Sequence, residues 1–204
     1  MKKSKNQSNC FQPFESDLHA QGVLNVAGID EAGRGPLAGP VVAAAVLFAP
    51  GITIHGVADS KTLSGRQREA IYPQIMEQAI AVGIGSVIEK VIDEINILQA
   101  TYRAMQQALI NLGINVDHVL VDGRRNPILD VPQTSIIKGD RLCFSIAAAS
   151  IIAKVTRDRE MISYDDQYPQ YGFARHKGYG TEFHRQAIQK YGLCPIHRRS
   201  FHLK

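Results

Sequence analysis

The chain has 204 residues, of which 45% are hydrophobic and 21% charged, and it carries 17 glycines and a formal net charge of +4. A chain of this length and composition can bury a sizeable apolar core, which excludes wholesale disorder. No apolar run approaches the roughly 20 residues of a membrane span, and none follows the basic N-terminal residues as in a secretory signal.

The cysteines, Cys10, Cys143 and Cys194, are odd in number and far apart in the sequence. We therefore expect neither a disulfide framework nor a C-x-x-C zinc site. A reducing cytoplasm is the simplest setting for such a chain, and nothing in the sequence requires more than a monomer.

The first elements in chain order are an extension and a pair of strands. Residues 1–22 are polar and lack a hydrophobic period, so we expect a flexible extension before one ordered domain over 23–204. The apolar runs 26–29 and 41–48 are separated by glycines and prolines, which predicts two paired strands joined by a turn.

The later elements alternate between helical and extended patterns. The sequence from Ser64 to Gln67 fits a capping box, and this predicts a helix that runs to about residue 79. We expect the remaining elements to be strands at 81–89, 118–122 and 135–140, and helices at 93–112, 143–164 and 181–191. This order predicts an α/β fold with a mixed central sheet flanked by helices, followed by a basic helical segment at the C-terminus.

Acidic residues stand where three of the predicted strands end. Asp30 and Glu31 close the first strand, Asp122 closes the strand at 118–122, and Asp140 ends the one at 135–140. Because sites in open α/β sheets commonly form outside the carboxyl ends of strands, we expect these acids to converge. Four carboxylates without His or Cys make an all-oxygen site that suits Mg²⁺ or Mn²⁺. The alternative is that each acid is a helix cap, a turn former or a surface charge.

A glycine-rich turn, Gly33, Arg34 and Gly35, directly follows the first two acids. Glycines expose backbone N–H groups to phosphate oxygens, and the arginine adds a forked donor. The alternative is a tight turn with structural glycines. The chain has neither a P-loop nor a G-x-G-x-x-G motif, so no nucleotide cofactor is indicated.

The last thirty residues form a basic segment. Residues 175–204 contain seven Lys or Arg and one acid, and Tyr179 lies there between two glycines. Rings beside cations are typical of nucleic-acid surfaces, although Tyr179 could instead close the core at a loop. Lys61 and Lys138 could likewise contact a backbone phosphate or be ordinary surface charges.

The segment 27–40, AGIDEAGRGPLAGP, resembles the signature of the type 2 ribonuclease H family, ribonuclease HII. The resemblance continues in the same order through most of 24–201, in the blocks at 59–64, 121–123, 137–140, 145–158, 176–181 and 197–201. It implies an RNase H-like fold. It also implies a Mn²⁺- or Mg²⁺-dependent endonuclease that cuts the RNA strand of RNA–DNA hybrids and nicks duplex DNA 5′ of an embedded ribonucleotide.

The resemblance also assigns roles by position. It places Asp30, Glu31, Asp122 and Asp140 in the family's metal site. It further implies that Gly33–Gly35 senses the ribonucleotide 2′-hydroxyl and that Tyr179 stacks on the adjoining deoxyribose. Asp158 is expected to be a helix-surface acid rather than a ligand.

Two other readings of the sequence stay open. One is a nucleic-acid-binding module without catalysis, which the basic segment alone would fit. The other is a different nuclease of the same superfold, such as a junction resolvase, since a fold does not by itself assign a substrate.

Overall fold

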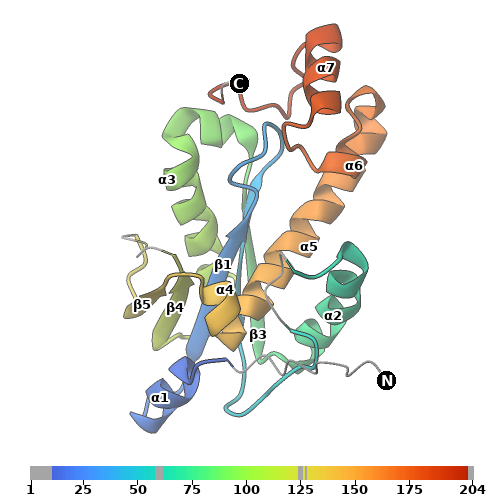
Figure 1. The fold of residues 1–204 in the computed structure, drawn as a ribbon. Coiled ribbons are helices and arrows are strands. Elements are labelled where there is room, and N and C mark those ends of the chain that lie inside the picture. The colour runs from blue at the N-terminus through green and yellow to red at the C-terminus, as the bar shows by residue number, and fades with distance from the viewer. Residues whose placement is uncertain (1–10, 58–61, 124–125, 127, 202–204) are drawn as a thin grey trace, which may run out of the picture.

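The structure is a computed structural model of the chain and describes residues 11–57, 62–123, 126 and 128–201. Its centre is a five-stranded sheet in the order β3-β2-β1-β4-β5 (Figure 1). The strands are β1 (Val26–Ala32), β2 (Val41–Leu47), β3 (Ala81–Val87), β4 (His118–Asp122) and β5 (Gln133–Ile136). β2 is antiparallel to β1 and β3, whereas β1 is parallel to β4 and β4 to β5. The predicted mixed sheet is confirmed.

Helices cover both faces of this sheet. α3 (Glu89–Ile110) packs on β2 and β3, and α5 (Phe144–Gln167) packs on β1 and β2 with α2 (Gly65–Gln78) beside it. Figure 1 shows α3 on one side of the sheet and α5 and α2 on the other. No helix in the described part of the chain is long and apolar enough to cross a membrane.

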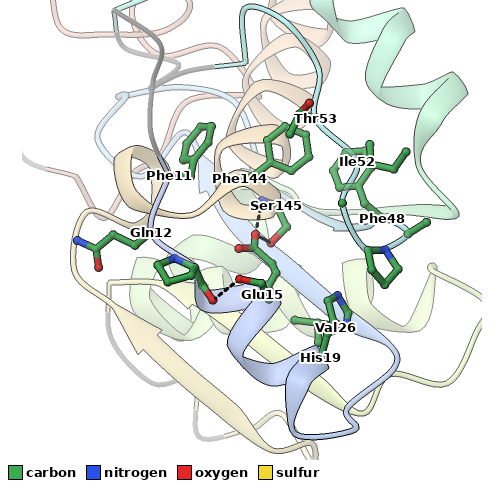
Figure 2. A pocket seen from close by; sticks show the side chains of 15 residues that line it. Phe11, Gln12, Glu15, His19, Val26, Phe48, Ile52, Thr53, Phe144 and Ser145 are labelled. Atoms are coloured by element: carbon green, nitrogen blue, oxygen red, sulfur yellow. Dashed lines mark hydrogen bonds between the residues drawn. The ribbon is translucent and has the colours of Figure 1, made fainter.

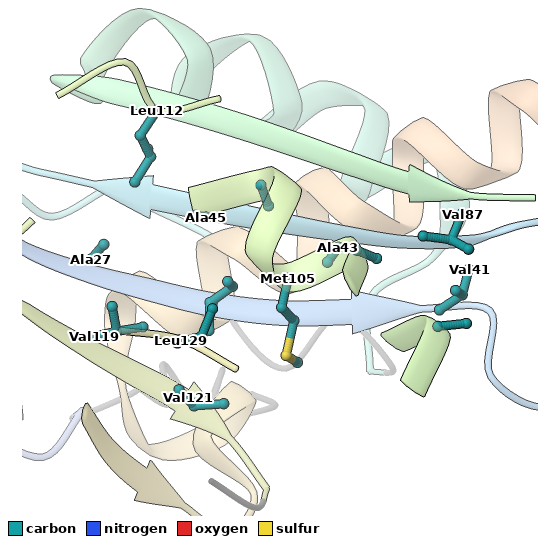
Figure 3. Packing of buried hydrophobic residues seen from close by; sticks show 14 of the residues in the cluster. Ala27, Val41, Ala43, Ala45, Val87, Met105, Leu112, Val119, Val121 and Leu129 are labelled. Atoms are coloured by element: carbon teal, nitrogen blue, oxygen red, sulfur yellow. The ribbon is translucent and has the colours of Figure 1, made fainter. Parts of the chain in front are cut away.

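Small residues in the central strands set the spacing of these layers. Successive β2 residues alternate in direction, so Ala43 and Ala45 pack in the cluster under α3, whereas Ala44 and Val46 pack with α5. Figure 3 shows Ala43 and Ala45 near Met105 of α3. The predicted capping box is also present, because the Ser64 hydroxyl accepts from the Gln67 backbone and the Gln67 side chain accepts from Ser64.

The C-terminal segment forms a separate cluster around the end of α5. It contains α6 (Phe173–His176) and α7 (Glu182–Tyr191), and buried Tyr171 and Phe173 stack with their ring centroids 5.4 Å apart. In Figure 1 this segment lies at the opposite end of the molecule from α1 (Phe14–Ala20).

The region expected to be a flexible extension differs in its described part. α1 forms there, and Phe14 and Leu18 pack against a small apolar cluster of the domain. The Glu15 carboxylate accepts hydrogen bonds from both the backbone N–H and the hydroxyl of Ser145, each at 2.8 Å (Figure 2). Phe14, Leu18 and the Glu15 carboxylate at the start of α5 thus attach this segment to the domain, although its overall polarity predicted a flexible extension. Residues 1–10 lie outside the described part.

The strand predicted over 135–140 is also shorter than expected. β5 ends at Ile136, Lys138 adopts a left-handed conformation with φ of 61°, and Asp140 lies in the one-turn helix α4 (Gly139–Leu142). A left-handed residue cannot continue a strand, so the chain turns before it reaches the acid.

Candidate active site

A hollow of about 490 Å³ opens where β1 and β4 end. Because the two strands are parallel and adjacent, their C-terminal residues meet at one edge of the sheet. The hollow is lined by three carboxylates, three cations, the glycine turn, a serine and a tyrosine: Asp30, Glu31, Asp122, Arg34, Arg68, Lys154, Gly33, Gly35, Ser150 and Tyr179. Most of the side chains predicted to act on a nucleic acid therefore face one space.

Asp30 is the most enclosed of the three carboxylates, with 4% of its surface exposed. Its Oδ1 accepts a hydrogen bond from the Glu31 backbone N–H at 2.7 Å. Burial raises the pKa of Asp30 well above its usual value, and the negative charges of Glu31 and Asp122 raise it further. A cation in the hollow would relieve both the desolvation and the repulsion.

Glu31 and Asp122 are each held by a donor from a neighbouring segment. Glu31 forms an ion pair with Arg34 at 3.2 Å, and Oδ1 of Asp122 accepts from the Gly139 backbone N–H at 2.6 Å. The second bond ties the end of β4 to the start of α4. Asp140 directly follows Gly139 in the sequence, so this bond keeps it near Asp122. Asp140 itself is buried and does not line the hollow.

The donor set fits a hard divalent cation, since it consists of carboxylate oxygens alone. Among the residues that the structure describes, no three Asp, Glu, His or Cys side chains already stand together at metal-ligand spacing. Mg²⁺ is commonly bound through one or two carboxylates together with waters and substrate oxygens, and an open set of this kind suits it.

The two glycines of the turn serve different purposes. Gly33 has a φ of +97°, and a Cβ atom there would lie 2.1 Å from Nε of Arg157, so the protein's own packing requires glycine. Gly35 has no such φ, and a Cβ there would meet only Cε1 of Tyr179, at 3.9 Å. Glycine at position 35 therefore leaves open space in the hollow rather than solving a packing problem.

Tyr179 stands at the far side of this space, with 45% of its surface exposed. Its backbone N–H donates to the His176 carbonyl at 2.9 Å. Nζ of Lys154 lies 5.8 Å from the ring centroid and pairs with Asp158 at 2.7 Å. Asp158, expected to be a helix-surface acid, is thus the partner of a cation that lines the hollow.

The structure does not bring every predicted residue to the hollow. Lys138 is exposed and does not line it. Lys61 lies outside the described residues. Arg68, Ser150 and Lys154 line the hollow but were not predicted as site residues. For the last two, the spacing of four residues on one helix was a usable signal, since it places both on the same face.

The basic segment is only partly a surface. Arg198, His184 and His197 are all buried, with exposures of 2%, 0% and 2%. Nε2 of His184 and Nε2 of His197 are 3.0 Å apart, and Nδ1 of His184 lies 2.9 Å from the Tyr179 carbonyl. The carbonyl can only accept, so His184 donates from Nδ1 and accepts from His197. Burial lowers the pKa of each ring to about 4, so both are neutral at neutral pH.

Comparisons with known proteins agree on one family. The family model described as Ribonuclease HII matches residues 27–204. The ribonuclease HII of Ruminiclostridium cellulolyticum is 57% identical over 188 residues, which are 92% of this chain and 74% of that protein. That of Syntrophus aciditrophicus is 53% identical over 191 residues, which are 94% and 90% of the two chains. Among solved structures, the ribonuclease H2 from Pyrococcus horikoshii superimposes with a TM-score of 0.73 at 30% identity, covering 88% of this chain and 95% of that one. The matched region includes the whole hollow and the C-terminal segment.

Proposed function

Since this chain belongs to the ribonuclease HII family and is a ribonuclease H endonuclease with that fold, we propose which bond it cuts and which residues act. The hollow hydrolyses the phosphodiester on the 5′ side of a ribonucleotide embedded in duplex DNA, and also cuts the RNA strand of RNA–DNA hybrids. The products carry a 3′-hydroxyl and a 5′-phosphate.

One observation carries this proposal. The carboxylates Asp30, Glu31 and Asp122 share a single hollow with the open face of Gly35 and with the exposed ring of Tyr179. The carboxylates suit phosphate hydrolysis with a divalent cation. The open face of Gly35 and the Tyr179 ring suit a nucleotide with a 2′-hydroxyl, the chemical group that distinguishes RNA from DNA.

The carboxylates Asp30, Glu31 and Asp122 would hold Mg²⁺ or Mn²⁺, with Asp140 completing the set from α4. When bound, such ions supply an activated water and stabilise the departing oxygen. The Asp122–Gly139 hydrogen bond fixes the direction of one carboxylate, and the Glu31–Arg34 ion pair fixes another. Arg68 and Lys154 line the same hollow and offer positive charge to the phosphates on either side of the cut bond.

Tyr179 holds the nucleotide from the opposite side. Its ring faces the space left by Gly35, where a sugar or base can stack between them. We infer that the enzyme works as a monomer in a reducing, cytoplasmic setting. Cys143 and Cys194 are free and buried, and burial raises the pKa of both thiols, which keeps them unreactive.

Three substrates of matched length test the proposal: duplex DNA with one ribonucleotide, the same duplex without it, and an all-DNA four-way junction. We expect Mg²⁺- or Mn²⁺-dependent cutting of the first alone, 5′ of the ribonucleotide, with a 3′-hydroxyl end. Preferential cutting of the junction would assign a resolvase activity instead. Binding without cutting under either ion would leave only a nucleic-acid-binding module.

A further inference from the structure

Among the described residues, the side chain of Arg198 donates hydrogen bonds only to backbone carbonyls. It lies in the basic segment, yet 2% of its surface is exposed. Its guanidinium donates five hydrogen bonds of 2.6–3.2 Å to one short turn, with acceptors that are the carbonyls of Gly33, Arg34, Pro36, Gly39 and Pro40. One side chain thus uses its forked donors to hold the turn that lines the active site.

This arrangement is electrostatically expensive. Burial and, after it, the neighbouring charge of Arg157 together lower the pKa of Arg198 to about 9, so the guanidinium is still protonated at neutral pH. Among the described residues, neither arginine forms an ion pair with a carboxylate. Burying a cation without a counter-charge is unfavourable, and a buried apolar side chain would stabilise the same region more simply. What an arginine offers at position 198, and an apolar side chain does not, is the set of hydrogen bonds to the turn.

The inward carbonyls determine where the adjoining N–H groups point. In a trans peptide the C=O and the following N–H are antiparallel, and the described chain contains no cis peptide bond. Because the carbonyls of Gly33 and Arg34 point at Arg198, the N–H groups of Arg34 and Gly35 point away from it. Neither N–H donates to an acceptor in the described part of the protein, and both residues are exposed and line the hollow.

Arg157 fixes the same turn relative to Tyr179. From α5 it donates to the carbonyls of Pro40 at 2.9 Å, Ala38 at 3.1 Å and Lys177 at 3.0 Å. The first two lie in segment 33–40, which also contains the carbonyls that Arg198 holds, and the third lies two residues before Tyr179. The hydrogen bonds of Arg157 therefore hold segment 38–40 and the segment before Tyr179 together, although the two are far apart in the sequence.

We propose that Arg198 is a positioning residue for ribonucleotide recognition, which orients the Arg34 and Gly35 N–H groups toward the 2′-hydroxyl oxygen. Arg157 sets the distance between these donors and Tyr179. This inference rests on the proposed function, because it concerns how the same hollow distinguishes a ribonucleotide from a deoxyribonucleotide. Arg198 touches no substrate and acts only through the backbone that it holds.

The test measures two constants with the full chain and Mg²⁺ or Mn²⁺. One is KM for duplex DNA with a single ribonucleotide, and the other is Ki for the same duplex without the ribonucleotide as a competitor. Loss of folded protein lowers kcat and leaves both constants unchanged. Loss of oriented donors raises KM, because it removes contacts to the 2′-hydroxyl, and leaves Ki unchanged.

We expect Arg198→Met to raise the ratio of KM to Ki roughly tenfold, the value of one to two hydrogen bonds. Arg198→Lys keeps the charge but offers three donors for five carbonyls, so we expect a smaller rise of roughly threefold. The lysine variant keeps the test decisive if the methionine variant does not fold. The matched control is Glu15→Ala, which removes hydrogen bonds at the other end of α5 and should keep the wild-type ratio.

A wild-type ratio in folded Arg198→Lys or Arg198→Met protein would overturn the positioning role. Failure of the proposed function looks different, since the wild-type chain itself would then cut the ribonucleotide duplex no better than the all-DNA duplex.

Discussion

The two sides of the active-site hollow are built by opposite means. On the sheet side, acids at the ends of β1 and β4 project into the hollow, where burial first and then their mutual repulsion raise the pKa of Asp30. On the side of the glycine turn, buried cations lie behind the backbone and donate hydrogen bonds to its carbonyls. The first side presents charged side chains to the substrate, and the second presents oriented backbone. Substitutions should therefore remove chemistry on one side and discrimination on the other.

The largest effect is expected on the sheet side. Asp30→Asn or Asp122→Asn should lower kcat at least about a thousandfold, because each removes a negative ligand oxygen from the site that stabilises the transition state. Binding of an RNA–DNA hybrid, followed by fluorescence anisotropy, should change little.

Asp117→Asn is the matched control for these variants. Asp117 accepts from the backbone N–H of Asn25 at 2.9 Å, ahead of the start of β1 and away from the hollow. The Asp117→Asn variant makes the same chemical change outside the hollow, so we expect near wild-type turnover. Near-normal turnover in Asp122→Asn would contradict the carboxylate site.

The two glycines of the turn allow the sides to be separated further. Gly33→Ala should destabilise the fold by about 3 kcal/mol or more, since the new methyl group overlaps Arg157 and the positive φ disfavours a side chain. Gly35→Ala should leave the melting temperature almost unchanged and still lower cutting at a single ribonucleotide on the order of a hundredfold, because its methyl group occupies ligand space. Thermal unfolding and kcat/KM distinguish the two outcomes, and equal loss of stability in both variants would contradict the separation.

The sequence made the sheet side predictable and concealed much of the other side. Strand periodicity and acids at strand ends indicated β1, β4 and the position of Asp30, Glu31 and Asp122. The charge of the basic segment was only partly informative, because it suggested a nucleic-acid surface, whereas Arg198, His184 and His197 are buried. Burial of a cation depends on carbonyls supplied by a segment more than 150 residues earlier, as in the bond from Arg198 to Gly39. Local pattern carries no information about such a partner.

Acidification should weaken the turn side before it affects the sheet core. Both His184 and His197 have pKa values lowered to about 4 by burial, so the folded state favours their neutral forms. Their contribution is complete above the unfolded pKa of about 6.5 and is lost as the pH falls from there toward 4. A shift of this size is worth roughly 3 kcal/mol for each ring, so we expect a loss of up to roughly 6 kcal/mol for the pair over this range.

Urea unfolding at a series of pH values measures this loss. A double substitution, His184→Gln with His197→Gln, should flatten the pH dependence between 6.5 and 4 while lowering stability at pH 7. An unchanged slope in that variant would assign the acid sensitivity to other groups.

The smallest effect is expected at Tyr179, which completes the turn side without taking part in the chemistry. Tyr179→Ala should lower kcat/KM at a single embedded ribonucleotide about tenfold, within the range of base or sugar stacking on a ring. Tyr179→Phe keeps the ring over Gly35 and should remain close to wild type. The effect should be weaker on a long RNA–DNA hybrid, where any register along the strand offers a 2′-hydroxyl and loss of one stacking contact matters less. If the alanine and phenylalanine variants behave alike on the single-ribonucleotide duplex, Tyr179 does not stack, and the backbone donors held by Arg198 carry the discrimination alone.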